Sequence, residues 1–154
     1  MLPNFIETNQ INAQILTFDE EVSTCKDVFK LENSIPSILL CKSILFSYSN
    51  EKGKEYAMVI LEGKKKVNWD KLKTILHASS ARLATPEEVL ETTGYEVGEV
   101  PPISIFGTKT YIDQGVLEHA WVLCGGGSKH TLLKIQTKDL LEHAFEPEIV
   151  NVAE

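Results

Sequence analysis

The sequence lacks several features that would place it in a common class of protein. No apolar run is long enough to cross a bilayer, and residues 1–7 show no basic segment followed by an apolar core, so neither a membrane span nor a secretory signal is predicted. The chain has fewer basic than acidic residues. Its 15 lysines and arginines and 22 acidic residues give a net charge of −7. Such a chain binds phosphate backbones poorly as a whole, so any nucleic-acid partner must be held locally. We expect a cytoplasmic protein with no membrane partner.

Paired cysteines and metal-binding motifs are also missing. The three cysteines, Cys25, Cys41 and Cys124, form no C-x-x-C pair and are odd in number, which disfavours a disulfide framework. Cys41 and Cys124 lie in apolar, strand-like runs and are predicted to be small core residues. The four histidines have no metal-ligand spacing, and a zinc site between Cys124 and His130 is a minor alternative.

The chain is long and apolar enough to fold around one hydrophobic core. It has 154 residues, of which 43% are hydrophobic, and no repeat or linker divides it, so residues 1–154 are predicted to form a single domain. Strands are predicted at 14–18, 40–48, 56–61, 82–84, 109–112, 119–124 and 130–135, and helices at 20–31, 69–76, 86–93 and 137–143. Hairpins mixed with helix-separated strands favour an α+β fold with helices outside a mixed sheet.

The segment from Thr93 to Pro102 is the most unusual in the chain. It holds Gly94 and Gly98 four residues apart and then the pair Pro101 and Pro102. Glycine permits positive φ and close approach, whereas proline fixes φ and removes a donor, so a rigid loop with exposed backbone groups is predicted. Such a loop can hold a small polar ligand without using side chains. A tight helix-to-strand connection is the alternative that local composition favours.

Lys42 is the second candidate, because it interrupts the apolar run 38–46. By strand alternation it shares a face with Leu40, Ile44 and Phe46, all apolar. An ammonium buried without a partner is costly, so a pocket-lining lysine is favoured over one that points to solvent. Two weaker candidates follow: Asp113 after the strand residues Tyr111 and Ile112, and the glycine run at 125–127. A turn cap and a hairpin connection are their structural alternatives.

In their order along the chain, the Lys42 strand, the loop 93–102, the segment 111–113 and the glycine run resemble the YbaK/prolyl-tRNA synthetase-associated family of aminoacyl-tRNA editing domains. The resemblance extends over about residues 20–142. It implies a strongly curved mixed β-sheet, close to a barrel and so a pseudo-barrel, with peripheral helices. It also implies that Gly98 and Pro102 are the ends of the glycine-x-x-x-proline motif of the family. The segment 103–107 is more apolar than the family pattern leads us to expect.

The resemblance further implies the role of each candidate residue. Lys42 is expected to position the substrate and to stabilise charge, and the backbone at Gly98 to orient a water, so both are assigned as catalytic. The residues expected to bind substrate are Pro101, Pro102, Asp113, Gly125, Gly126 and Ser128. No metal and no organic cofactor is implied.

The function implied is that of a free-standing deacylase, which hydrolyses the ester of a mischarged alanyl-, cysteinyl-, seryl- or prolyl-tRNA. Its partners would be the tRNA acceptor end and an aminoacyl-tRNA synthetase, while the oligomeric state is left open. One alternative is a non-catalytic module that binds a nucleotide or aminoacyl ligand on the same fold. A weaker alternative is a thiol-dependent enzyme that uses Cys41 or Cys124.

Overall fold

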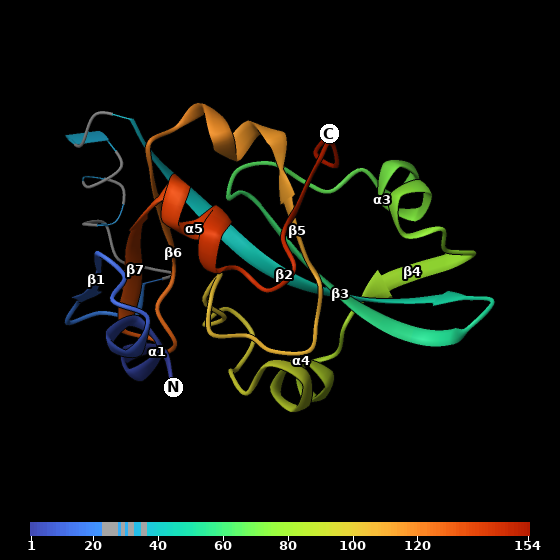
Figure 1. The fold of residues 1–154 in the computed structure, drawn as a ribbon, viewed down its shortest axis with the longest axis horizontal. Coiled ribbons are helices and arrows are strands. Elements are labelled where there is room, and N and C mark those ends of the chain that lie inside the picture. The colour runs from blue at the N-terminus through green and yellow to red at the C-terminus, as the bar shows by residue number, and fades with distance from the viewer. Residues whose placement is uncertain (23–27, 29, 31–32, 35–36) are drawn as a thin grey trace.

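The computed structural model describes the chain except for residues 23–27, 29, 31–32 and 35–36, and its main feature is a curved, mixed β-sheet with helices around it (Figure 1). The strands are β1 (Ala13–Thr17), β2 (Ile38–Asn50), β3 (Gly53–Glu62), β4 (Ser80–Leu83), β5 (Thr110–Asp113), β6 (Trp121–Gly125), β7 (Thr131–Gln136) and β8 (Glu148–Val150). The helices are α1 (Leu2–Thr8), α3 (Trp69–Leu76), α4 (Pro86–Thr93) and α5 (Thr137–His143), with a 3-10 turn at Gln114–Glu118.

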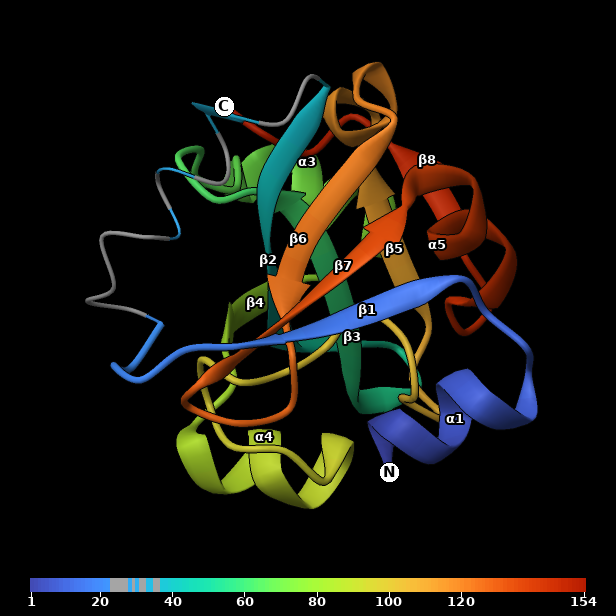
Figure 2. The ribbon, with the colours of Figure 1, turned by 90° about the vertical axis from the view of Figure 1, so that its left-hand side faces the viewer.

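The strand order is β1-β7-β6-β2-β3-β5-β8, with β4 paired to β2 beside this path. The sheet is mixed, since β2–β6, β3–β5 and β5–β8 are parallel pairs and the others are antiparallel. The sheet bends strongly but does not close, because β1 and β8 remain separate edges (Figure 2). The predicted α+β class and curved mixed sheet are confirmed. Among the described residues, no helix is long and apolar enough to cross a membrane.

Strand β2 joins the two halves of the sheet, because it changes neighbours along its length. One edge pairs with β3 from Cys41 to Asn50. The other edge pairs with β6 over residues 38–40 and with β4 over residues 46–49. Between these two pairings lies a stretch of β2, residues 41–45, that faces neither β6 nor β4.

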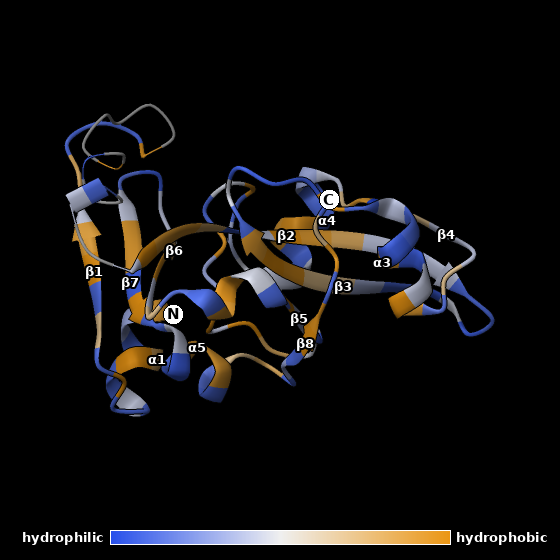
Figure 3. Ribbon diagram, turned by 90° about the horizontal axis from the view of Figure 1, so that it is seen from above, coloured by the Kyte–Doolittle hydropathy of each residue, from blue (hydrophilic) through white to orange (hydrophobic). Residues whose placement is uncertain are grey.

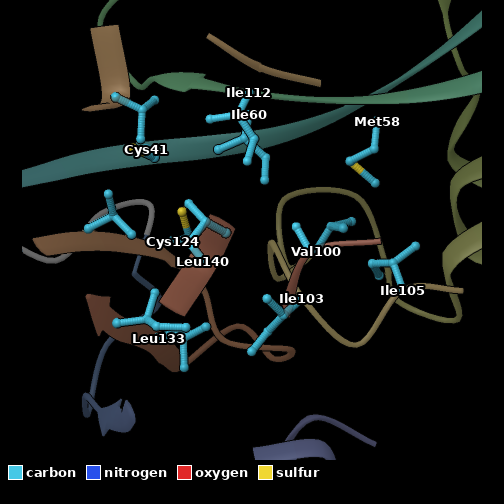
Figure 4. Packing of buried hydrophobic residues seen from close by; sticks show 14 of the residues in the cluster. Cys41, Met58, Ile60, Val100, Ile103, Ile105, Ile112, Cys124, Leu133 and Leu140 are labelled. Atoms are coloured by element: carbon cyan, nitrogen blue, oxygen red, sulfur yellow. The ribbon is translucent and has the colours of Figure 1, made fainter. Parts of the chain in front are cut away.

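The main core cluster lies inside the curve of the sheet. Leu39, Cys41 and Leu45 of β2 belong to it, as does Cys124 of β6, so the prediction that both of these cysteines are core residues is confirmed. Val100, Ile103 and Ile105, from the loop before β5, pack among these side chains (Figure 4). The apolar segment after Pro102 therefore forms part of the core.

A second cluster packs on the opposite face of β2 and β3. Phe46 and Val59 of these strands meet Leu72 and Leu76 of α3 there. The two long strands are apolar along their middle and become polar toward the tip of their hairpin, where less of the protein covers them (Figure 3). Burial on both faces explains why β2 reads as a continuous apolar run rather than an alternating one.

Local sequence signals set the ends of several elements. The side chain of Asn68 accepts a hydrogen bond from the backbone of Lys71 and begins α3. Thr85 and Glu88 form a capping box at the start of α4, and Gly94 ends that helix with φ of +81°. The hairpin of β2 and β3 turns through Glu51 and Lys52, and both strands are longer than predicted.

Thr137 is the first helical residue of α5, and its hydroxyl donates to the backbone oxygen of His119. Glu148–Val150 forms β8, because β5 offers it an open parallel edge. The predicted helix 20–31 lies largely outside the described residues.

The carboxylate of Glu88 ties α4 to the sheet. It accepts hydrogen bonds from Arg82 Nη1 at 2.7 Å, from the Tyr56 hydroxyl at 2.6 Å and from the backbone of Thr85 at 2.9 Å, and Lys54 Nζ lies 2.7 Å away. Arg82 foremost, and then Lys54, hold the pKa of this carboxyl well below its usual range. The side chain is only 13% exposed, so these contacts are partly shielded from water.

We expect Glu88→Gln to lower the thermal midpoint at pH 7, because it removes the charge that Arg82 and Lys54 share. A carboxyl whose pKa is depressed by folding stabilises the protein above its unfolded pKa and loses that effect as the pH falls. The difference between wild type and variant should therefore narrow on acidification below about pH 4.5. Thermal unfolding from pH 3 to 7 measures this. Glu87→Gln, an exposed neighbour, is the control, and equal midpoints at pH 7 would contradict the assignment.

Candidate active site

A cavity of about 420 Å³ opens beside residues 41–45 of β2, the stretch that pairs with neither β6 nor β4. We call it the Lys42 cavity. Its volume falls within the ordinary range for small-molecule sites. Its wall is formed by Val22, Val28, Leu40, Cys41, Lys42, Ser43, Gly63, Gly98, Val100, Gly125 and Leu132. Lys42, Gly98 and Gly125, three of the residues singled out from the sequence, therefore meet at one place.

Lys42 carries the only charge among these described wall residues. It lies half-buried on β2, on the face away from the main core. Its neighbours on that face belong to two different apolar clusters, because Leu40 packs with Leu132 and Ile44 packs with Phe46. The ammonium thus stands at the boundary between two apolar groups, beside a hollow, and an anion in that hollow would be attracted to it.

The loop between α4 and β5 forms the facing part of the wall. Gly98 has φ of +84°, which a residue with a side chain adopts only with strain. Val100 is buried in the main core and anchors the loop from within. The backbone N–H of Gly127 donates to the oxygen of Glu99 at 2.9 Å, which fastens this loop to the turn between β6 and β7.

The fit between the loop and the glycine run depends on Gly125. A Cβ at this position would lie 2.4 Å from the backbone oxygen of Val100 and 2.9 Å from its carbonyl carbon. Both neighbours are backbone atoms and cannot turn aside. Gly125 is therefore required by the close approach of the loop, and a hairpin connection alone does not account for it.

A second cavity of about 430 Å³ involves the residues next to these, and we call it the Glu99 cavity. Gly126, Ser128 and Glu99 line it, so two of the predicted substrate-binding residues lie there and not in the Lys42 cavity. The hydroxyl of Ser128 is 2.7 Å from that of Thr131, within the hairpin. Burial first, and then the nearby Glu96, raise the pKa of Glu99.

The remaining predicted residues lie away from the described wall of the Lys42 cavity. Pro101 and Pro102 are buried and direct the loop into the core. Asp113 is 3% exposed, and its carboxylate accepts backbone hydrogen bonds from Gly115 at 3.0 Å, Val152 at 2.9 Å and Ala153 at 3.0 Å. These contacts match the turn-cap alternative and extend it, because Asp113 also anchors the C-terminal segment.

Ser43 and Gly63 are among the wall residues that sequence reasoning did not single out. Ser43 follows Lys42 directly, and a polar residue inside an apolar strand run was the signal that could have identified it. Gly63 directly follows β3, and its backbone N–H donates to the oxygen of Leu40 at 2.8 Å. Within the described ranges, no three His, Cys, Asp or Glu side chains gather as a metal site requires.

Comparison with known proteins assigns this arrangement to a family. The sequence model of the aminoacyl-tRNA editing domain matches residues 19–143, most of the chain. The chain belongs to the aminoacyl-tRNA editing domain family. The resemblance seen in the sequence is thus confirmed.

Relatives of this editing domain include proline–tRNA ligases. That of Halalkalibacterium halodurans is 36% identical over 108 residues, which cover 69% of this chain and 18% of the ligase. That of Bacillus subtilis is 38% identical over 76 residues, which cover 49% of this chain and 13% of the ligase. The chain therefore spans about a fifth or less of the length of these relatives.

Solved structures show the same fold over nearly the whole editing domain. A hypothetical protein matches with a TM-score of 0.82 at 24% identity, covering 99% of each chain. A candidate trans-editing enzyme for prolyl-tRNA synthetase matches with the same score and identity, covering 99% of this chain and 94% of its own. At this identity the likeness establishes the fold.

We expect Gly125→Ala to displace the loop at Gly98 and to lower both the thermal midpoint and any ligand affinity of the Lys42 cavity, because the added methyl group meets the Val100 carbonyl. Gly98→Ala should cost less, about 1–2 kcal/mol of stability, since only its positive φ is strained. Thermal unfolding and ligand titration measure these effects. Gly53→Ala, strained in φ but at the distant hairpin tip, is the control, and a Gly125→Ala variant as stable as wild type would contradict the packing argument.

Proposed function

We propose that this editing domain is an aminoacyl-tRNA deacylase that cleaves the ester between an incorrect amino acid and its tRNA. The proposal rests on one observation, that Lys42 and the loop at Gly98 line the same cavity. In the reaction, water adds to the ester carbonyl carbon and the bond to the terminal ribose oxygen breaks. The proton lost by the water passes to that oxygen, and the products are the free amino acid and the tRNA with its hydroxyl restored.

The groups in the cavity suit a mechanism based on positioning and charge. The described wall holds no carboxylate and no imidazole, so no side chain there is an evident general base. The Lys42 ammonium would stabilise the negative charge that develops on the carbonyl oxygen or hold the terminal phosphate. The backbone at Gly98 and Val100, fixed by Gly125 and Gly127, would keep the ester and its water in place.

The substrate we propose is the acceptor end of a tRNA charged with alanine, cysteine, serine or proline. Family membership and the proline–tRNA ligase relatives support a mischarged tRNA as the substrate class and a synthetase as the source. We propose that one domain, residues 1–154, acts in trans in the cytoplasm on tRNAs released by that synthetase. The net charge of −7 agrees with a protein that grips only the acceptor end.

Replacing Lys42 tests the proposal. We expect Lys42→Ala to reduce single-turnover deacylation by about a hundredfold, the loss that follows removal of one group that stabilises the oxyanion. Lys42→Arg should keep part of the activity, because it retains the charge but places it differently. The assay is loss of amino acid from charged tRNA. Lys138→Ala, an exposed lysine on α5, is the control and should match wild type.

The panel of substrates decides between catalysis and binding alone. Alanyl-, cysteinyl-, seryl- and prolyl-tRNA should include at least one that wild type hydrolyses well above the uncatalysed rate. A protein that leaves all four intact, yet binds an aminoacyl adenosine analogue, would be a non-catalytic module on the same fold. Full activity of Lys42→Ala would contradict the proposed stabilisation of the developing negative charge by Lys42.

A further inference from the structure

Ser43 occupies the middle of residues 41–45, the stretch of β2 that pairs with β3 on one edge and with neither β6 nor β4 on the other. In an antiparallel pair, alternate residues direct their N–H and C=O groups to the partner, and the residues between direct theirs to the other edge. The bond from Gly63 N–H to Leu40 C=O shows that even-numbered residues of β2 face β3. Ser43, an odd-numbered residue, therefore directs its N–H and C=O away from β3.

The bonds on that other edge agree with this pattern. Trp121 N–H, at the start of β6, donates to the oxygen of Ser37, and Ala84 N–H, just after β4, donates to the oxygen of Leu45. Both acceptors are odd-numbered. Because β6 pairs only as far as residue 40 and β4 pairs from residue 46, the main chain of Ser43 meets neither strand. The Lys42 cavity lies here, with Ser43 and Gly125 in its wall.

The side chain of Ser43 is likewise unsatisfied. Its Oγ is buried and has no hydrogen-bond partner in the described part of the chain. Buried polar groups are nearly always paired, because leaving one unpaired costs stability. Among the described residues, the N–H, the C=O and the hydroxyl of Ser43 thus have no hydrogen-bond partner, and they lie beside a cavity that Lys42 also lines.

We propose that Ser43 binds the amino-acid part of the ester as a neighbouring strand residue would. An aminoacyl ester offers N–H groups on its α-ammonium and an acceptor on its carbonyl, the same two kinds of group that a strand residue offers. The Ser43 C=O and Oγ accept from the α-ammonium, and the Ser43 N–H donates to the ester carbonyl. This assignment rests on the proposed function and adds to it the recognition of the α-amino group.

The arrangement has a consequence for the reaction. The Ser43 N–H is a fixed donor aimed at the carbonyl oxygen on which negative charge develops, next to the Lys42 ammonium. Main-chain donors of this kind stabilise an oxyanion without rearranging during the reaction. Because recognition uses the main chain, these contacts do not involve the side chain of the amino acid. Other parts of the cavity therefore discriminate the size and polarity of that side chain.

The first experiment compares two esters of the same tRNA that differ only in the α-substituent. One is an aminoacyl ester that wild type hydrolyses, and the other is its α-hydroxyacyl counterpart, such as lactyl for alanyl. After correction for uncatalysed hydrolysis, we expect kcat/KM to be at least about tenfold lower for the hydroxyacyl ester, because a hydrogen bond from a charged donor is lost. Equal values would overturn the proposal.

A variant then identifies the residue responsible. Ser43→Ala should narrow the preference for the aminoacyl over the hydroxyacyl ester severalfold, because one of the two acceptors is removed. Ser47→Ala is the matched control, since Ser47 lies on the same face of β2, is 4% exposed and lies outside the wall of the cavity. A purely structural role of Ser43 would lower both rates equally and leave the preference unchanged, which would overturn the assignment to this hydroxyl.

The main chain can be tested directly. Replacing the amide N–H of Ser43 by an ester oxygen should lower kcat and should lower the thermal midpoint less than the same replacement at a residue paired on both edges, because this N–H makes no bond to a neighbouring strand. The same replacement at Ser47, which pairs with Arg82 of β4, should lower the midpoint and leave kcat intact. The reverse pattern would refute the role of the Ser43 main chain.

Binding separates failure of this proposal from failure of the proposed function. If wild type hydrolyses no ester, the deacylase assignment fails, and titration with an amide-linked alanyl adenosine and its lactyl counterpart tests Ser43 alone. Tighter binding of the alanyl compound, weakened by Ser43→Ala and not by Ser47→Ala, would support the site. Equal affinities for the two compounds would refute it.

Discussion

The structure depends on the way β2 changes its neighbours. One strand pairs with β6 at its beginning and with β4 near its end, and the sheet bends so strongly between them that residues 41–45 meet neither. A gap in a sheet leaves backbone groups that require partners. The loop that carries Gly98 and Val100 approaches this gap without closing it, and the remaining space is the Lys42 cavity.

The chemistry of the site follows from this construction. Most of the wall consists of apolar side chains and of glycines that expose the backbone, and Lys42 supplies the only charge among its described residues. A site of this kind holds its ligand by shape and by main-chain groups, and its one cation stabilises negative charge on the ligand. It suits the hydrolysis of an ester that is already reactive, for which positioning of water and carbonyl is the main requirement.

The same construction explains why glycines gather where they do. Gly125 admits the Val100 carbonyl at a distance that excludes a side chain, and Gly127 donates to Glu99 to hold the loop in place. The second cavity, lined by Glu99, Gly126 and Ser128, arises from the same contact between loop and turn. The Glu88 cluster, farther along β3 and β4, secures the helix from which this loop departs.

The sequence by itself determined the local features. Asn68, the box from Thr85 to Glu88 and Gly94 set helix ends, and a lysine within an apolar strand marked Lys42, because caps, turns and strand alternation depend on residues close in the chain. Only the tertiary structure decided that Lys42, Gly98 and Gly125 share a cavity, that Asp113 anchors the C-terminal segment and that the Ser43 hydroxyl has no partner among the described residues. Those facts depend on which strands lie beside β2 and where they leave it, and such long-range pairings have no signature in neighbouring residues.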